Sequence, residues 1–255
     1  MAHIQQIIEE IESTTPTALT WTAALLGSIA VGLSGVVPIV LIPLDNNPTQ
    51  SPHQTDKHLK LLLSFAVGGL LGDVFLHLFP EAYGTLENRG DDSHSSRLNL
   101  GMWILGGILA FLVLQKIFEF TEEREGKKLP EPRKKILGYL NLLANCIDNF
   151  LHGLTVASSF LTSIKLGMIT TFAILIHEIP HEIGDFAILL RSGFTRWEAG
   201  KAQLWTASVG VLGALAALSL DSVQSLEART AWILPFSAGG FLNIGRSSFN
   251  TIILI

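Results

Sequence analysis

The stretch HEIPHEIGDFAILL, from His177 to Leu190, carries five ionisable side chains in an otherwise apolar segment. In an α-helix, at about 100° per residue, these side chains fall within a wedge of roughly 140°, and the opposite face is apolar. Each ionisable group at the centre of a membrane helix costs about 2.5–3.5 kcal/mol, so several on one helix must face protein or water. The stretch therefore predicts a membrane helix whose polar face is turned into a helix bundle. The five residues are His177, Glu178, His181, Glu182 and Asp185.

The composition of the whole chain is that of a membrane protein. Its 255 residues are 48% hydrophobic and only 15% charged, and the mean hydropathy is positive. A helix needs about 20 mostly apolar residues to cross the hydrocarbon core of a bilayer. The predicted fold is an all-α, polytopic transmembrane helix bundle embedded in the lipid bilayer, with seven candidate spans: 18–42, 59–82, 99–120, 137–161, 166–190, 202–220 and 231–255.

The distribution of charge predicts the orientation of these spans. Residues 1–17 form an N-terminal tail, residues 18–255 the transmembrane domain, and residues 121–136 a charged loop within it. Lys and Arg concentrate on loops that share one side, including 121–136, and such loops stay cytosolic. The N-terminus is therefore predicted to be lumenal or extracellular. The formal net charge of −5 and the near balance of charge in 121–136 argue against a nucleic-acid partner.

A second polar stripe follows the fourth candidate span. Its residues lie within roughly 80° of one another on a helix, with Asn149 at the edge. Hydrogen bonds to a neighbouring helix would account for Asn141 or Ser159 alone, but an ionisable pair on the same stripe indicates a metal path. The stripe consists of Asn141, Asn145, Asp148, His152, Thr155 and Ser159.

The spacing of these groups suits a divalent metal ion. His177 and His181 are one helical turn apart and can reach the same ion, while Asp148 and His152 on a facing helix would complete four ligands. Nitrogen and oxygen donors of this kind suit zinc and also iron or manganese.

The second candidate span carries a further ionisable group of residues. Asp73, His77 and Glu81, spaced four residues apart, lie along one face of this span. They are interpreted either as interfacial anchors or as the mouth of a metal path.

These residues carry a resemblance to a known family. HEIPHEIGD, from His177 to Asp185, resembles the HExPHExGD motif of one branch of the ZIP (Zrt/Irt-like) metal transporters at every fixed position. DNFLHG, from Asp148 to Gly153, resembles the family's fourth-helix motif with the acidic and imidazole ligands exchanged. That exchange is similar to the variant in members of the Golgi and endoplasmic reticulum.

The resemblance implies a zinc transporter rather than an enzyme. The family has an eight-helix, often dimeric bundle that moves zinc into the cytosol, so residues 18–255 would be a metal-transport domain in a Golgi, endoplasmic reticulum or vesicle membrane rather than the plasma membrane. One metal site would use Asp148, His152, His177 and His181. The other would use Asn149 and Glu178, with His152 and His181 shared. The remaining path residues would be Asp73, His77, Glu81, Asn145, Glu182 and Asp185.

Two rival hypotheses remain open from the sequence. After PFSAGGFLNI the chain continues as GRSSFNTIILI, where the family would complete the seventh helix with apolar residues and add an eighth. We therefore expect a truncated form, and a non-transporting regulator of a full-length relative is one alternative. The other is an intramembrane protease, because HEIPH satisfies the HExxH pattern of zinc metalloproteases, although Pro180 distorts the turn that would present both histidines.

Overall fold

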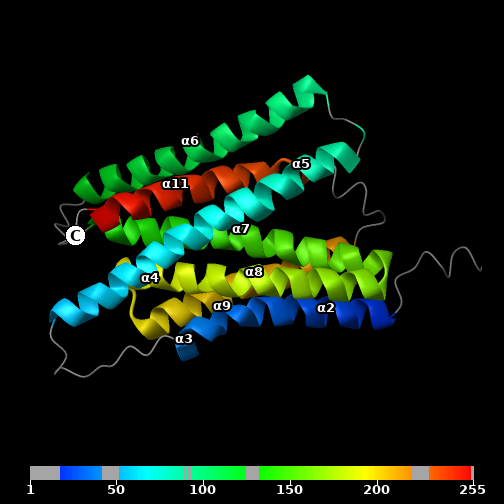
Figure 1. Ribbon diagram of the computed structural model, residues 1–255, viewed down its shortest axis with the longest axis horizontal. Coiled ribbons are helices and arrows are strands. Elements are labelled where there is room, and N and C mark those ends of the chain that lie inside the picture. The colour runs from blue at the N-terminus through cyan, green and yellow to red at the C-terminus, as the bar shows by residue number, and fades with distance from the viewer. Residues whose placement is uncertain are drawn as a thin grey trace, which may run out of the picture.

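The seven predicted spans are all helical in the computed structural model (Figure 1). The structure describes residues 18–41, 52–88, 90, 93–124, 132–219 and 230–253, and the predicted tail 1–17 lies outside them. In chain order the elements are α2 (Ala18–Leu33), η1 (Ser34–Val36), α3 (Val37–Leu41), α4 (Pro52–Asp73), η2 (Val74–Leu78), α5 (Phe79–Asn88), α6 (His94–Arg124), α7 (Pro132–Thr162), α8 (Ile164–Arg191), α9 (Arg196–Leu218) and α11 (Ile233–Ile253). No strand occurs among the described residues.

The helices form a multi-pass membrane protein. Four segments are long and apolar enough to cross a bilayer by composition: Ala18–Val40, Leu63–Glu87, His94–Phe118 and Arg196–Leu218. Helices α7 and α8 are also long, but the polar side chains that they bury lower their hydropathy. Large apolar side chains are exposed on the outer surface, among them Leu76, Leu109 and Phe172, as expected for a surface that meets lipid.

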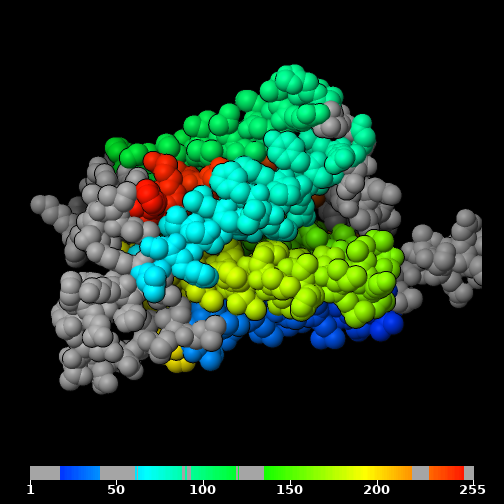
Figure 2. Space-filling model, in the orientation of Figure 1, coloured from blue at the N-terminus to red at the C-terminus, as the bar shows by residue number. Residues whose placement is uncertain are grey.

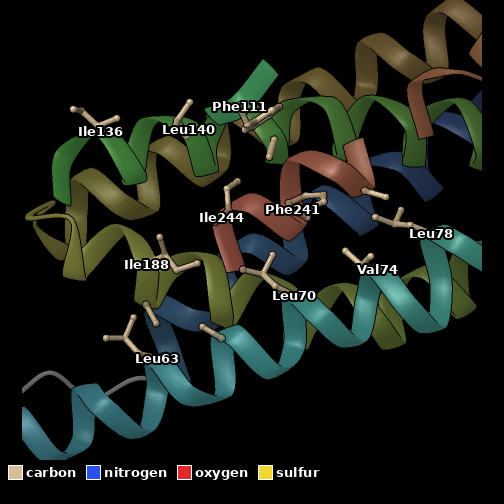
Figure 3. Packing of buried hydrophobic residues seen from close by; sticks show 14 residues of the cluster. Leu63, Leu70, Val74, Leu78, Phe111, Ile136, Leu140, Ile188, Phe241 and Ile244 are labelled. Atoms are coloured by element: carbon tan, nitrogen blue, oxygen red, sulfur yellow. The ribbon is translucent and has the colours of Figure 1, made fainter. Parts of the chain in front are cut away.

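Two hydrophobic clusters hold the bundle together. One joins α2, α7, α8 and α9 through residues such as Ala24, Leu154 and Ala214. The other joins η2, α4, α6, α7, α8 and α11, and Figure 3 shows Val74, Phe241 and Ile188 within it. Because α7 and α8 take part in both clusters, the surface that these two helices share lies between the two clusters. In Figure 2 the α4 segment lies along α8 on the viewed face.

Glycines set how closely the helices approach. A Cβ atom on Gly153 of α7 would meet the backbone oxygen of Gly210 on α9, and one on Gly213 would meet that of Phe150. These helices can pack backbone against backbone only because both positions lack a side chain. By contrast, a Cβ on Gly68 of α4 would have no neighbour within 4 Å. The α7–α9 contact thus fixes the face that α7 can turn toward α8.

The structure extends two helices into a predicted loop. The segment 121–136 is not all loop, because α6 continues to Arg124 and α7 begins at Pro132; Glu, Lys and Arg favour helix, so helices extend beyond their apolar part. Arg246, in the stretch GRSSFNTIILI, lies within α11, which runs to Ile253 as the candidate span 231–255 leads us to expect. Arg246 is exposed, and its Nη2 donates to Oδ1 of Asn243 at 3.2 Å.

The second span contains a feature that the sequence does not predict. Between α4 and α5 the chain makes a π-helical turn, η2, in which the backbone N–H of Phe79 bonds to the oxygen of Val74. Such wide turns are rare and are frequent at functional sites. Here the turn begins directly after Asp73 and contains His77.

Candidate metal centre

Helix α7 presents its polar stripe to the interior of the bundle. The stripe residues nearest the middle of the helix are all buried: Asn141, Asn145, Asp148, Asn149 and His152. The predicted stripe is therefore an inner face and not a surface in contact with lipid.

Helix α8 places its five ionisable groups against this face. Glu178, His181, Glu182 and Asp185 are buried, and His177 is partly buried. On the opposite side of α8, Phe172 is 65% exposed and Ile176 is 59% exposed. This division confirms the amphipathic helix predicted from the sequence. Pro180 lies inside α8, which remains helical through it.

His152 is the centre of the contacts between the two helices. Its Nε2 atom lies 3.3 Å from Nε2 of His177. Its Nδ1 atom lies 3.4 Å from Oε2 of Glu178 and 3.7 Å from Oδ2 of Asp148. One imidazole from α7 thus contacts both an imidazole and a carboxylate from α8. The candidate ligands from the two helices do point toward one another.

The backbone of α8 orients the ring of His177. Its Nδ1 atom lies 3.1 Å from the carbonyl oxygen of Ala173. A carbonyl oxygen only accepts, so this contact places the imidazole proton on Nδ1. The lone pair of Nε2, on the side of His152, then remains available for an ion, as in many metal-binding histidines.

The turn η2 adds a third imidazole. The ring of His77 lies 4.2 Å from that of His177 and 6.0 Å from that of His152, measured between ring centroids. His77 also lies 3.4 Å from Glu81, and both side chains are partly exposed. Asp73, one turn away, approaches Asp148 and His181.

Three overlapping groups of side chains could each hold one ion. Within each group the candidate ligand atoms lie within 4.8 Å of one another. The groups are His77, His152 and His177; Asp73, Asp148 and His181; and Asp148, His152 and Glu178. The four side chains predicted to share one site are therefore divided among these groups. Two residues that the sequence places on the transport path also take part: His77 belongs to the first group and Asp73 to the second.

Several of these atoms are buried without a hydrogen bond. Both carboxylate oxygens of Asp148 and of Glu178, and both ring nitrogens of His181, lack a partner. Their nearest ionisable neighbours are 3.4–3.9 Å away, which is too long for a good hydrogen bond. Buried polar groups without a partner indicate that something else satisfies them. Imidazole nitrogen and carboxylate oxygen are donors that zinc accepts.

Asn149 lies differently from its neighbours on α7. Its Nδ2 donates to the backbone oxygen of Asn145 at 3.1 Å and contacts that residue's side-chain oxygen. Its amide also approaches Glu182 of α8, and its backbone oxygen lies beside Gly210 of α9. Its predicted role as a ligand beside Glu178 stays a prediction.

Two residues at the site have no role in the sequence prediction. Gln203 of α9 donates to the backbone oxygen and to Oε2 of Glu182 at 2.9 and 2.7 Å. The ring of Phe241, from α11, meets His181 edge to face with centroids 5.1 Å apart. Gln203 could have been identified from the sequence, because it is an amide in the apolar part of α9. Phe241 lies in an apolar helix, and no sequence signal distinguishes it from its neighbours.

Comparisons with known proteins find one matching family and several similar relatives. The profile of the family described as ZIP Zinc transporter matches residues 18–135 and 121–248. Zinc transporter ZIP13 homolog of Drosophila melanogaster is 46% identical over 281 residues, which cover 88% of this chain and 79% of that protein. Zinc transporter ZIP13 of Pongo abelii is 53% identical over 229 residues, with coverage of 88% and 68%. Zinc transporter ZIP13 of Homo sapiens is 47% identical over 265 residues, with coverage of 88% and 71%. No solved structure gives a significant match.

Proposed function

Because this chain belongs to the ZIP zinc transporter family, we propose that it carries zinc across a membrane into the cytosol, along the surface between α7 and α8. Its relatives are named zinc transporters. The observation that carries the proposal is the buried set of imidazoles and carboxylates on these two helices, in which Asp148, Glu178 and His181 have no hydrogen-bond partners. A divalent cation would satisfy these groups.

The path begins at the partly exposed pair His77 and Glu81. From there the ring of His77 contacts His177, whose Nε2 faces His152. His152 in turn contacts Glu178 and Asp148. An ion could therefore move between overlapping ligand groups without losing all of its ligands at once. Asn149 and Glu178 would contribute to a second metal position beside the first.

The family match favours neither rival function. A zinc transporter family is not an enzyme family, and the relatives named above are transporters and not proteases. The regulator hypothesis finds no support in these relatives either. The overlapping ligand groups also extend from α4 and η2 to α7 and α8, as a pathway would.

Finer features of the function form part of the proposal. We infer a Golgi, endoplasmic reticulum or vesicle membrane from the exchange of ligands in the fourth-helix motif, and a lumenal N-terminus from the distribution of Lys and Arg. A homodimer is proposed from the family resemblance. Iron and manganese are further candidate substrates, because the nitrogen and oxygen donors also suit them.

Transport by the purified chain in lipid vesicles tests the proposal. Vesicles that contain a zinc-sensitive dye should fill with zinc when they carry the wild-type chain, and not when they carry Asp148→Ala. Wild-type vesicles that stay as impermeable as protein-free vesicles would contradict the proposal. Cleavage of a membrane substrate that is lost in Glu178→Gln, with zinc uptake unaffected, would favour the protease instead.

A further inference from the structure

A second group of buried polar side chains lies one helical turn beyond His181, toward the C-terminal end of α8. We call it the inner polar cluster; it consists of Asn141 and Asn145 from α7, Glu182 and Asp185 from α8, and Gln203 from α9. All five side chains are buried, with no more than 2% of any of them exposed. The cluster therefore lies inside the protein and not at a membrane surface.

The members of the cluster converge on its two carboxylates. Gln203 holds Glu182 by two hydrogen bonds, at 2.7 Å to Oε2 and 2.9 Å to the backbone oxygen. The Asn145 amide faces both Glu182 and Asp185. Asn141 approaches the Asp185 carboxylate, but not in hydrogen-bond geometry. Gln203 thus fixes one carboxylate, while the other remains without a direct partner.

The cluster is closed toward the first span. A Cβ atom on Gly35 of η1 would lie 3.3 Å from the carboxylate carbon of Glu182 and 3.4 Å from Cβ of Gln203. Glycine at this position lets the chain pass directly over the carboxylate. The inner polar cluster is consequently enclosed by α7, α8, α9 and η1.

In the described part of the chain, no Lys or Arg forms an ion pair with Glu182 or Asp185 of the cluster. The nitrogen nearest to Asp185 that can carry a positive charge is Nε2 of His181, 3.9 Å from Oδ1. Both oxygens of Asp185, both amide atoms of Asn141 and Oε1 of Gln203 lack hydrogen-bond partners. Burying a carboxylate without compensation is costly. These unpartnered atoms, four of them oxygens that can coordinate, indicate a cation as the missing partner.

His181 connects this cluster with the metal centre. Its Nδ1 lies 3.9 Å from Oε2 of Glu178, in the centre, and its Nε2 lies 3.9 Å from Oδ1 of Asp185, in the cluster. The two nitrogens of one imidazole therefore face two carboxylates of α8, one a turn before His181 and the other a turn after it. An ion that leaves Glu178 can find its next ligands without crossing an apolar barrier.

We propose that the inner polar cluster is a second cation subsite, in which Asp185 and the amide oxygen of Asn141 bind a divalent cation and Glu182, held by Gln203, compensates its charge. The inference rests on the proposed transport function and extends its path beyond His181. Because the donors of the subsite are oxygens, it accepts harder ions such as Mn²⁺ more readily than the imidazole-rich centre does. Zinc is bound there more weakly than at the centre, which suits release.

Metal binding by the purified full-length chain tests this subsite separately from transport. The double variant His152→Ala, His177→Ala removes two imidazoles of the metal centre. Binding of Mn²⁺ is then followed by the loss of the free-ion paramagnetic resonance signal. We expect this variant to retain a Mn²⁺ site. Adding Asp185→Asn should lower the Mn²⁺ affinity of that site by at least about tenfold. Loss of a residue that only supports a ligand already costs about tenfold or more, and Asp185 is proposed as a ligand itself. Asn141→Ala should also weaken it.

A matched control distinguishes the subsite from any buried amide. Asn243 of α11 is also buried, and its Nδ2 also lacks a hydrogen-bond partner, but it belongs neither to the metal centre nor to the inner polar cluster. Asn243→Ala should therefore leave Mn²⁺ binding unchanged. Unchanged Mn²⁺ affinity in both Asp185→Asn and Asn141→Ala would overturn the inference and favour neutral, protonated carboxyls with a structural role. Absence of any Mn²⁺ site in the double variant would overturn it as well.

Zinc transport is measured separately from Mn²⁺ binding. In vesicles, Asp185→Asn alone should slow zinc uptake, while zinc affinity at the metal centre stays within about twofold of wild type. Wild-type uptake in Asp185→Asn counts against the subsite only. Wild-type uptake in the double variant counts against the proposed function, whatever the Mn²⁺ result.

Discussion

The Nε2 atoms of His152 and His177 lie 3.3 Å apart, although the two residues belong to different helices. Two nitrogens bound to one tetrahedral zinc at about 2.0–2.1 Å are separated by roughly 3.3 Å. The rings are therefore already at the separation that a shared zinc requires. A zinc ion could bind with little movement of either helix, and such preorganisation favours binding.

Removing either imidazole should abolish most zinc uptake. His152→Ala and His177→Ala each delete a ligand with little change in packing, and we expect zinc affinity to fall by at least about tenfold to hundredfold. Uptake of radioactive zinc, normalised to the amount of protein in the membrane, measures the effect. His94→Ala is the control, since His94 is exposed at the start of α6. Similar uptake in all three variants would contradict the assigned ligands.

Acidification should weaken zinc binding. Coordination needs a neutral imidazole nitrogen, so protons compete with zinc for His152, His177 and His181. Affinity is therefore expected to be highest at neutral or mildly alkaline pH and to fall on acidification. Calorimetric titration with zinc, from mildly alkaline to acidic pH, checks the sign. An affinity that stays constant, or that rises on acidification, would show that imidazoles are not the ligands.

Phe241 should influence zinc binding through His181. The edge-to-face contact between the two rings is of a kind worth about 0.5–1.5 kcal/mol, so Phe241→Leu should weaken zinc affinity by roughly two- to tenfold. Phe111 belongs to the same hydrophobic cluster but contacts Phe236 instead. Phe111→Leu should lower the free energy of unfolding by about 0.5–1.5 kcal/mol. It should leave the zinc affinity of the folded protein unchanged. Equal affinities in both variants would remove Phe241 from the site.

Close packing between α7 and α9 should make Gly153 intolerant of side chains. A Cβ there would overlap the backbone oxygen of Gly210, so Gly153→Val should destabilise the protein by about 1–3 kcal/mol or more. Gly68→Ala meets no neighbouring atom and should be neutral or slightly stabilising, because Ala favours helix over Gly. Thermal unfolding in detergent compares the two. A Gly153→Val variant as stable as wild type would mean that these helices lie further apart.

The fold could largely be predicted from apolar runs, and the reasons are physical. A bilayer demands about 20 apolar residues per helix, and all seven runs found in this way are helices. The same reasoning failed at 121–136, where charged residues extend α6 and α7 beyond the apolar part. Periodicity also predicted which face of α8 is polar, since Phe172 and Ile176 are exposed and Glu178 is buried.

The contacts within the site were less predictable. Helical spacing places His177 and His181 on one face of α8, but it cannot show that His77 meets His177, because that contact depends on the π-helical turn η2. Gln203 and Phe241 reach the site only through tertiary packing. Periodicity on one helix carries no information about such neighbours.

Zinc located by anomalous scattering, in crystals of the zinc-loaded chain, tests the central claim most directly. We predict a peak between α7 and α8 at about 2.0–2.1 Å from Nε2 of both His152 and His177. A zinc peak at another place, with these two imidazoles not bound to metal, would contradict the account.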